Sequence, residues 1–288
     1  MRNSYSGSLV QLQDVLRKDL PLSVVLGGGG VRGLAHLGVL EVLSEQGFHL
    51  AEIVGTSVGA LILTYYAAVG LDVPTMRKLG LGMSSRHLLG WAFLRRFSPP
   101  IQHRFRRLAG IIPEYLDRLS NLPGDRLFHG VERIGLVAYD LEHREEIVCH
   151  NLQQELRLND ALRGAVAIPG IFPPRECLAG SRKLRLIDGG VTNKLPVDKL
   201  FSEPFRPAQI LAVDISNRIE HRQENSLKIN QLQAQFPQIP IVTVTPDTLG
   251  KATVLYRTNG LEALIESGKV VTQKLLSESV PPASAGGL

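Results

Sequence analysis

Cysteine is scarce in this chain, which excludes several kinds of cross-linked or metal-bound protein. Only Cys149 and Cys177 are present among 288 residues, and they do not form a CxxC pair. A disulfide framework or a cysteine-rich metal site needs more thiols at closer spacing. We therefore expect two buried or half-buried free thiols in a reducing compartment, with no metal and no other cofactor.

Long apolar runs are also missing. Residues 1–19 are polar and mixed in charge, and they lack the apolar core of a secretory signal. The longest nearly apolar stretch, residues 58–71, is too short to cross a bilayer and is interrupted by Thr64, Tyr65 and Tyr66. These absences predict a cytoplasmic protein whose contact with a membrane, if any, is peripheral.

Acidic residues are absent from one long segment, residues 73–113. That segment carries eight basic residues, interleaved with Trp91, Phe93, Phe97 and Phe105, in a chain of net charge +5. Such a pattern is typical of a basic amphipathic insertion that docks on anionic lipid. A solvated surface face over a structural aromatic core is the alternative.

Aromatic residues are few, whereas glycine and aliphatic residues are abundant. Aromatic residues make up 6% of the chain and hydrophobic residues 44%, and there are 28 glycines. This composition suits an α/β domain with glycine-built turns and excludes a disordered chain. We predict one domain over residues 21–276, an N-terminal extension over 1–20 and a flexible tail over 277–288.

The order of predicted elements indicates a parallel sheet. An apolar strand over 22–26 ends at four glycines, and leucines at helical spacing then predict a helix over 31–46. A short strand over 52–54 leads through a second glycine turn into an apolar helix over 60–69. Further strands are expected at 134–139, 146–149, 184–187, 210–215 and 241–244, further helices at 159–167 and 261–276, a rigid loop at 168–174 and a polar surface segment at 217–238.

The strongest local pattern is Gly55-Thr56-Ser57-Val58-Gly59, between a predicted strand and a predicted helix. A nucleophile on such a turn adopts strained backbone angles, and small neighbours let the strand and helix close around it. Free N–H groups at the helix N-terminus favour developing negative charge. The pattern also fits an ordinary turn or a serine that caps a helix.

Four consecutive glycines, residues 27–30, begin the segment GGGGVRG. Their N–H groups can point together at an oxyanion or a phosphate. Gly28, Gly30 and Gly33 also match the dinucleotide pattern G-x-G-x-x-G, which needs an acidic residue at the end of the second strand. Glu52 falls at the start of that strand, so we favour the oxyanion interpretation and keep a nucleotide-binding oxidoreductase as an alternative.

Asp188-Gly189-Gly190 follows an apolar predicted strand. A carboxylate at this point can accept a hydrogen bond from a serine hydroxyl and act as a general base, whereas an ordinary Asp-Gly turn is the alternative. A Ser-His-Asp triad finds little support. Only His221 follows Asp188, in the polar surface segment, and packing is the expected role of His36 inside the first helix.

Together and in this order, these segments resemble the patatin-like phospholipase family, in its bacterial single-domain branch, which is similar to the catalytic domain of neuropathy target esterase. GGGGVRG resembles the family's oxyanion loop, GTSVG its nucleophile elbow and DGG its catalytic Asp motif. The segments RGLAHLGVL at 32–40 and AIPGIFPP at 167–174 look like further family segments. The resemblance spans residues 22–197.

This resemblance implies a three-layer α/β/α sandwich with a largely parallel central sheet, and a serine hydrolase of lipid acyl esters. The family's substrates are commonly phospholipids and lysophospholipids, and no metal is needed at the serine. Ser57 would attack the ester carbonyl and Asp188 would take its proton. The N–H groups of Gly28, Gly29 and Gly30 would hold the oxyanion, and Arg32 would help to fix that loop. The remaining motif residues are Gly33, Gly55, Gly59, Gly189 and Gly190.

Two departures from the family pattern stand out. Lys194 occupies the second position where the family has Asn-Asn-Leu-Pro, and the arginine density of residues 73–113 is unusual. A non-catalytic scaffold that binds anionic membranes or nucleic acid through 73–113 is a further alternative. We expect a lipid ester substrate and no nucleic acid, and the sequence carries no signal for an oligomeric state.

Overall fold

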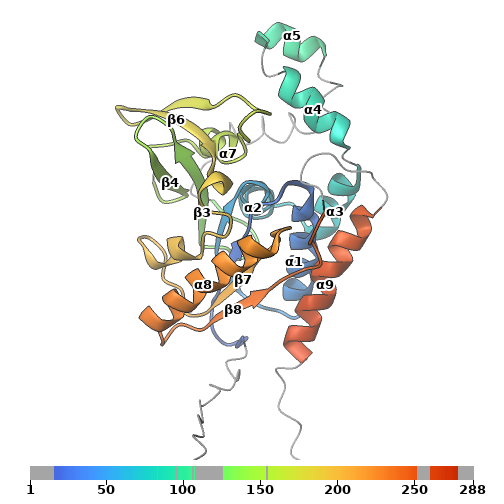
Figure 1. Cartoon of the computed structure of the whole chain (residues 1–288), viewed down its shortest axis with the longest axis vertical. Helices are drawn as coiled ribbons and strands as arrows, with labels where there is room; N and C mark the ends of the chain where they lie inside the picture. The colour runs from blue at the N-terminus through green and yellow to red at the C-terminus, as the bar shows by residue number, and fades with distance from the viewer. Residues whose placement is uncertain are drawn as a thin grey trace, which may run out of the picture.

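The chain forms one eight-stranded sheet with helices on both faces (Figure 1). The computed structural model describes residues 16–82, 84–94, 97–105, 107, 126–153, 155–251 and 260–277, so most of the predicted N-terminal extension and tail lies outside them. The strands are β1 (Leu22–Leu26), β2 (Leu50–Thr56), β3 (Arg133–Asp140), β4 (Glu145–His150), β5 (Arg175–Ala179), β6 (Arg182–Asp188), β7 (Ile210–Val213) and β8 (Ile241–Val244).

The helices follow the strands along the chain. The α-helices are α1 (Leu34–Glu45), α2 (Val58–Leu63), α3 (Val73–Gly82), α4 (Ser85–Leu94), α5 (Pro99–Arg104), α7 (Leu158–Ala165), α8 (Ile219–Gln235) and α9 (Leu261–Ser277). Shorter helical turns are η1 (Gly30–Gly33), η2 (Thr64–Ala68), η5 (Gly189–Val191) and η6 (Val197–Phe201). None of the helices within the described ranges combines the length and the apolar character needed to cross a membrane.

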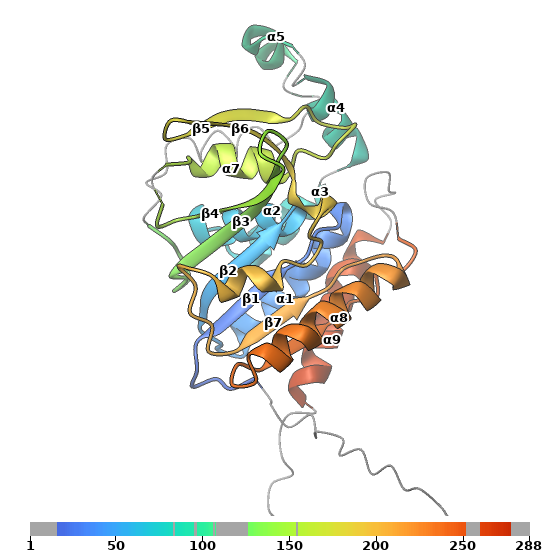
Figure 2. The same cartoon turned by 60° about the vertical axis from the view of Figure 1, so that its left-hand side comes forward.

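The sheet is parallel through most of its width. Its strand order is β5-β6-β3-β2-β1-β7-β8, with β4 also paired to β3. The strands β3, β2, β1, β7 and β8 are mutually parallel, whereas β4, β5 and β6 form antiparallel pairs (Figure 2). The predicted α/β class with a largely parallel central sheet is confirmed.

Alternate residues of the strands face two separate layers of the core. Val24 belongs to the cluster that includes α1, α2 and α9, whereas Val25 belongs to the cluster that includes Ile229 of α8. Because successive strand residues point to opposite faces, the central sheet is buried on both sides. This gives the three layers that the family resemblance implies.

The backbones of helices α1 and α9 lie in close contact where the helices cross, because each helix carries a glycine at that point. A Cβ atom on Gly38 would lie 2.0 Å from the carbonyl oxygen of Ile265, and one on Gly268 would lie 1.9 Å from that of Ala35. Beside this contact, Lys269 Nζ lies 2.9 Å from a carboxylate oxygen of Glu41. The last helix is therefore closely fitted to the first.

The predicted strands and helices are present, with ends that differ by a few residues, but several further elements were not predicted, among them α3, α4, α5, α8 and β5. Strand β5 follows directly on the predicted loop 168–174. The segment 217–238 is polar and largely exposed as expected, but most of it is helical, as α8. Cys149 is buried and Cys177 is half-buried, both as free thiols.

The basic segment 73–113 divides into two structurally different parts. In α3, Val73 and Met76 are buried, and Arg77 forms ion pairs with Glu41 and Glu262. In contrast, α4 and α5 stand at the upper end of the molecule in Figures 1 and 2. Of the described parts of this segment, only α4 and α5 project in these views, and residues 108–113 lie outside the described ranges.

Candidate active site

The candidate site forms where strands β2 and β6 meet end to end alongside β3. Thr56, the last residue of β2, pairs with Val137, and Asp188, the last residue of β6, pairs with the next residue, Ala138. Since β2 is parallel and β6 antiparallel to β3, the two strands run toward each other and their final residues are neighbours. Ser57 Oγ donates a hydrogen bond of 2.6 Å to Asp188 Oδ2, and both residues are buried.

The turn that carries Ser57 is strained, and its glycines make it possible. Ser57 has φ 54° and ψ −126°, a region that residues with a side chain rarely adopt. A Cβ atom on Gly59 would lie 2.1 Å from the carbonyl oxygen of Leu26, and one on Gly55 would lie 2.6 Å from the carbonyl carbon of Gly59. Both glycines therefore let α2 pack directly on the strands.

Asp188 is oriented by its own glycines. The N–H of Gly190 donates a hydrogen bond of 2.7 Å to Asp188 Oδ1, which leaves Oδ2 for the serine hydroxyl. A Cβ atom on Gly189 would lie 2.5 Å from the carbonyl oxygen of Val137, so only glycine lets the end of β6 lie this close to β3.

The buried position of Asp188 changes its basicity. Burial raises the pKa of its carboxyl group to about 6, and the hydrogen bonds from Ser57 and Gly190 partly oppose that shift. The carboxyl group is therefore ionised at neutral pH and more basic than an ordinary aspartate. A general base needs this combination.

The glycine loop lies against the serine and is held by backbone hydrogen bonds. The Gly27 N–H donates to the carbonyl oxygen of Val213 at 3.1 Å, and the Gly28 N–H donates to that of Lys194 at 2.8 Å. A Cβ atom on Gly28 would lie 3.2 Å from the Cβ of Ser57. The loop therefore lies next to the Ser57 turn, as expected.

These bonds change the role that the resemblance gives to Gly28. Its N–H is already engaged by Lys194 and is not available to an oxyanion in this structure. Gly29 and Gly30 donate their N–H groups to no acceptor in the part of the chain that the structure describes. Gly30 also has φ 59°, which turns the chain sharply at this point.

Arg32 packs on the glycine loop. A Cβ atom on Gly29 would lie 2.9 Å from Arg32 Nη2, and Arg32 Nη1 donates to the carbonyl oxygen of Lys251 at 3.2 Å. Burial lowers the pKa of the Arg32 guanidinium to about 10, so it remains cationic at neutral pH. These contacts are those of a residue that fixes the loop, the role that the family resemblance implies for Arg32.

His36 is a site residue whose role the sequence analysis missed. It is completely buried in α1, and its Nε2 lies 2.8 Å from the carbonyl oxygen of Gly27. Burial lowers the pKa of the imidazole to about 4, so at neutral pH the uncharged ring donates Nε2–H to the loop. A polar residue inside an apolar helix was the signal available, because buried polar groups need partners.

Lys194 takes part through its backbone. Its carbonyl oxygen accepts the Gly28 N–H, a contact that any residue could supply. The surrounding loop is braced by Lys228 of α8, whose Nζ donates to Asn193 Oδ1 at 2.7 Å and to the carbonyl oxygen of Leu195 at 2.5 Å. The departure at Lys194 therefore leaves this part of the site intact.

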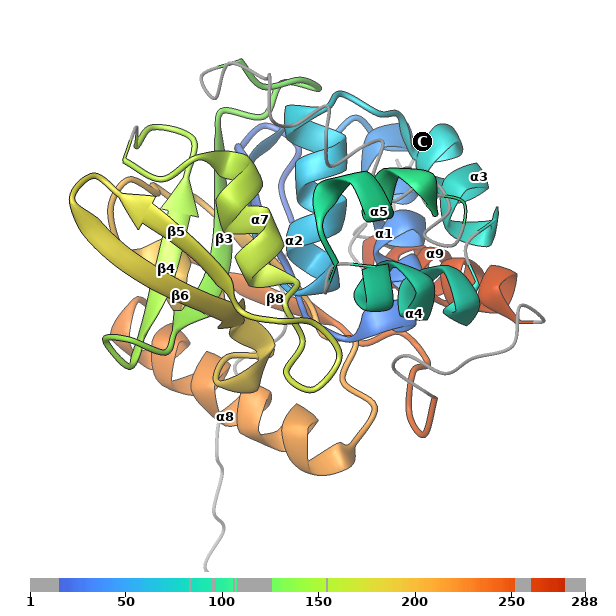
Figure 3. The same cartoon turned by 90° about the horizontal axis from the view of Figure 1, so that it is seen from above.

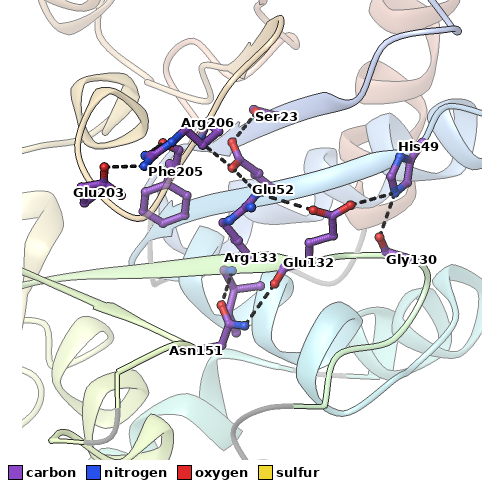
Figure 4. Close-up of polar contacts among 11 residues, drawn as sticks. Ser23, His49, Glu52, Gly130, Glu132, Arg133, Asn151, Glu203, Phe205 and Arg206 are labelled. Atoms are coloured by element: carbon purple, nitrogen blue, oxygen red, sulfur yellow. Dashed lines mark hydrogen bonds and ion pairs between the residues drawn. The ribbon is translucent and has the colours of Figure 1, made fainter.

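The nucleotide-binding alternative needs an acidic residue to hold the ribose, and Glu52, the candidate, is engaged in other contacts. Glu52 is buried at the opposite end of β2 from Ser57 and accepts hydrogen bonds from Ser23 Oγ at 2.7 Å, Arg133 Nη1 at 2.9 Å and the Arg206 N–H at 2.7 Å (Figure 4). It therefore serves as a structural anion that joins β1, β2 and β3. No histidine of the described ranges contacts Ser57 or Asp188, which also leaves the triad without support.

Comparison with known proteins agrees with this geometry. The family model described as patatin-like phospholipase matches residues 24–201, which include the glycine loop, Ser57 and Asp188. This chain belongs to the patatin-like phospholipase family. Family membership supports lipid hydrolase activity.

Relatives of this patatin-like chain occur in bacteria and animals. An uncharacterized protein, YqhO, of Bacillus subtilis is 27% identical over 71% of this chain and 74% of its own length. An uncharacterized NTE family protein of Mycobacterium tuberculosis is 30% identical over 61% of this chain and 44% of its own. Neuropathy target esterase sws of Drosophila melanogaster is 26% identical over 68% of this chain but only 13% of its own, so these last two relatives are much longer than the matched region.

Solved structures share the patatin-like fold. VipD from Legionella pneumophila superposes with a TM-score of 0.55 over 92% of this chain and 68% of its own, at 14% identity. Human GIVD cytosolic phospholipase A2 gives a TM-score of 0.53 over 93% of this chain and 64% of its own, at 12% identity. At these identities the likeness concerns the fold alone.

Proposed function

We propose that this chain is a serine hydrolase that cleaves the carboxylic ester bonds of phospholipids or lysophospholipids through a Ser57–Asp188 dyad. The observation that carries the proposal is the 2.6 Å hydrogen bond between the buried hydroxyl and the buried carboxylate. The strained Ser57 turn, the raised pKa of Asp188 and the family membership support it. A dyad of this kind needs no histidine and no metal ion.

In the first half of the proposed reaction, Ser57 Oγ attacks the ester carbonyl while Asp188 accepts the hydroxyl proton. Negative charge develops on the carbonyl oxygen, where the N–H groups of Gly29 and Gly30 stabilise it. The leaving alcohol then takes the proton from Asp188 as the carbon–oxygen bond breaks. The acyl group remains as an ester on Ser57.

In the second half, water replaces the alcohol. Asp188, again ionised, accepts a proton from that water as its oxygen attacks the acyl-enzyme carbonyl. The same amides stabilise the second oxyanion. Ser57 Oγ recovers the proton from Asp188 as the fatty acid leaves, and the site returns to its starting state.

The test combines covalent labelling with three variants. A fluorophosphonate probe should label Ser57 in the wild type, as located by peptide mass mapping. Ser57→Ala should abolish the label, and Ser57→Ala and Asp188→Asn should each lower kcat/KM on a lipid ester by about 10⁴-fold. Ser226→Ala, on the exposed surface of α8, serves as the matched control and should leave the covalent label and kcat/KM unchanged.

The pH dependence offers a second measurement in the same assay. Because Asp188 must be ionised to act as a base, kcat/KM should rise with pH through about 6 and then level off. Ester hydrolysis that persists in Ser57→Ala would refute the dyad.

A further inference from the structure

Exposed apolar side chains recur in helices α4 and α5 and in the residues that follow each helix. From residue 89 to residue 105 every fourth residue is a large apolar one, and each is exposed: Leu89 43%, Phe93 55%, Phe97 39%, Ile101 41% and Phe105 48%. The described part of the chain has no other phenylalanine among its exposed large hydrophobic residues. We call these five residues the apolar ladder. Phe93 and Phe97 lie in contact, and large apolar residues exposed together on one projecting segment indicate a binding face.

The same part of the chain carries arginines that form no ion pair with the acidic residues that the structure describes. Arg86, Arg104 and Arg107 are exposed, and no ion pair joins any of them to an acidic side chain of the described ranges. Arg77 of α3 differs, because it is paired with Glu41 and Glu262. Since residues 73–113 contain no Asp or Glu, the charged side chains of this segment itself are all basic.

The position of α4 and α5 suits contact with an extended surface. Both helices stand above the level of α2, whose first turn follows Ser57, at the upper end of the molecule in Figures 1 and 2. Seen from above, they lie in front of α1 and next to α2, with α7 on the other side of α2 (Figure 3). A flat surface in contact with α4 and α5 would therefore lie over the half of the molecule that contains the candidate site.

We propose that the apolar ladder, together with Arg86, Arg104 and Arg107, docks this protein on anionic lipid bilayers. The aromatic and aliphatic side chains enter the interface between head groups and acyl chains, while the guanidinium groups lie on the lipid phosphates. Aliphatic members such as Leu89 and Ile101 favour lipid over nucleic acid, because they gain by leaving water and offer nothing to a phosphate backbone. This inference concerns binding and does not require the proposed hydrolase activity.

The test measures binding to vesicles of phosphatidylcholine alone and of phosphatidylcholine with phosphatidylglycerol, by co-sedimentation at low and high salt. The wild type should bind the anionic vesicles at least tenfold more tightly, and salt should weaken that binding. Leu89→Ser/Phe93→Ser should lower the partition coefficient at least tenfold. The matched control is Ile219→Ser/Leu227→Ser, which removes two exposed apolar residues of α8 and should change nothing.

The charged residues are tested with Arg86→Gln/Arg104→Gln/Arg107→Gln. Each arginine near an anionic surface is worth about a fivefold change in binding, so the triple variant should lose roughly 100-fold on anionic vesicles. On vesicles of phosphatidylcholine alone its binding should match the wild type. Circular dichroism melting of each variant establishes that it is folded.

Hydrolysis of a water-soluble short-chain ester separates this proposal from the proposed function. Docking variants that keep this activity but lose vesicle binding support the proposal, and vesicle binding without any ester hydrolysis would reject the dyad alone. Binding that ignores both salt and anionic lipid would overturn the docking proposal. The docking proposal would also be overturned if the wild type is a dimer that does not bind vesicles and the variant Leu89→Ser/Phe93→Ser is a monomer.

Discussion

Two buried residues of the candidate site, Asp188 and His36, respond to pH in opposite directions. The pKa of Asp188 is raised from 3.8 to about 6, so between these values the folded chain binds the proton more tightly than the unfolded chain. Its contribution to stability therefore falls as the pH rises through this range. The pKa of His36 is lowered from 6.5 to about 4, so its contribution rises with pH over nearly the same range.

Single variants should reveal these opposed contributions. With Asp188→Asn, the free energy of unfolding should rise more steeply between pH 4 and 6.5 than in the wild type. At pH 8 it should exceed the wild-type value by up to about 3 kcal/mol, because a desolvated charge has been removed. With His36→Gln, the difference in the free energy of unfolding between the variant and the wild type should instead fall as the pH rises. Urea denaturation at a series of pH values measures both.

The double variant Asp188→Asn/His36→Gln is the control for this prediction. It lacks both groups, so its slope between pH 4 and 6.5 should lie between those of the two single variants. Identical slopes in all four proteins would mean that neither residue has the shifted pKa given above.

For individual residues, the sequence predicted which of them form the site but not all of the contacts that they make. Ser57 and Asp188 were predicted because close backbone contacts restrict the positions that flank them to glycine, which leaves a pattern in the sequence. The hydrogen bond from His36 to Gly27 depends on how the glycine loop folds back on α1, and the use of the Gly28 N–H by Lys194 depends on the register between distant segments. No local pattern encodes that register.

At the scale of elements, the glycine loop and the Ser57 turn are packed against each other through one glycine. A Cβ atom on Gly33, the last residue of η1, would lie 2.3 Å from Cγ2 and 2.7 Å from Cγ1 of Val58. Val58 begins α2 directly after Ser57. The two loops that form the site are thus positioned against each other by this contact.

Gly33→Ala should destabilise the protein and disturb the site, and removal of the clashing methyl groups should reverse the effect. We expect Gly33→Ala to cost about 1–3 kcal/mol and to lower kcat/KM, because the new methyl group pushes Val58 and the Ser57 turn apart. Gly33→Ala/Val58→Ala should recover at least half of both losses. Chemical denaturation and ester hydrolysis provide the two measurements.

Gly82→Ala is the matched control, since a Cβ atom there would meet nothing within 4 Å. Its stability should stay within about 0.5 kcal/mol of the wild type. A double variant no better than Gly33→Ala would show that the two loops are not coupled through Val58.

The elements themselves were largely predictable from apolar runs and glycine turns, but their partners were not. The sequence predicts both β2 and β6 as strands. It does not predict that they run toward each other along β3, because the pairing of each strand with β3, which brings Ser57 and Asp188 together, follows from the whole fold. Helix α8 was missed because few of its residues are buried, so its apolar periodicity is weak.

At the scale of the molecule, the family match ends before the fold does. The match stops at residue 201, whereas β7, β8, α8 and α9 follow it. Strand β1 pairs with β7 from Ser23 to Leu26, and α1 is covered by α9 through Gly38 and Gly268. The matched region alone would expose one edge of β1 and one side of α1.

A chain that ends at residue 201 should therefore fail to fold as a monomer. An unpaired central strand beside an uncovered apolar helix is prone to aggregate. We expect aggregates in size-exclusion chromatography and no cooperative thermal transition in circular dichroism. A chain that ends at Ser277 keeps every described contact and should melt like the full chain, whereas a cooperative transition in the 201-residue form would contradict the prediction.

The meeting of Ser57 and Asp188 without an imidazole has an electrostatic consequence for the proposed reaction. A histidine base would become a cation while the oxyanion forms, so the enclosed site would then hold two new opposite charges. Here the carboxylate loses its charge as the oxyanion gains one, and the site keeps a single negative charge that moves across a few ångströms. Acylation therefore creates no additional ion in a region from which water is largely removed.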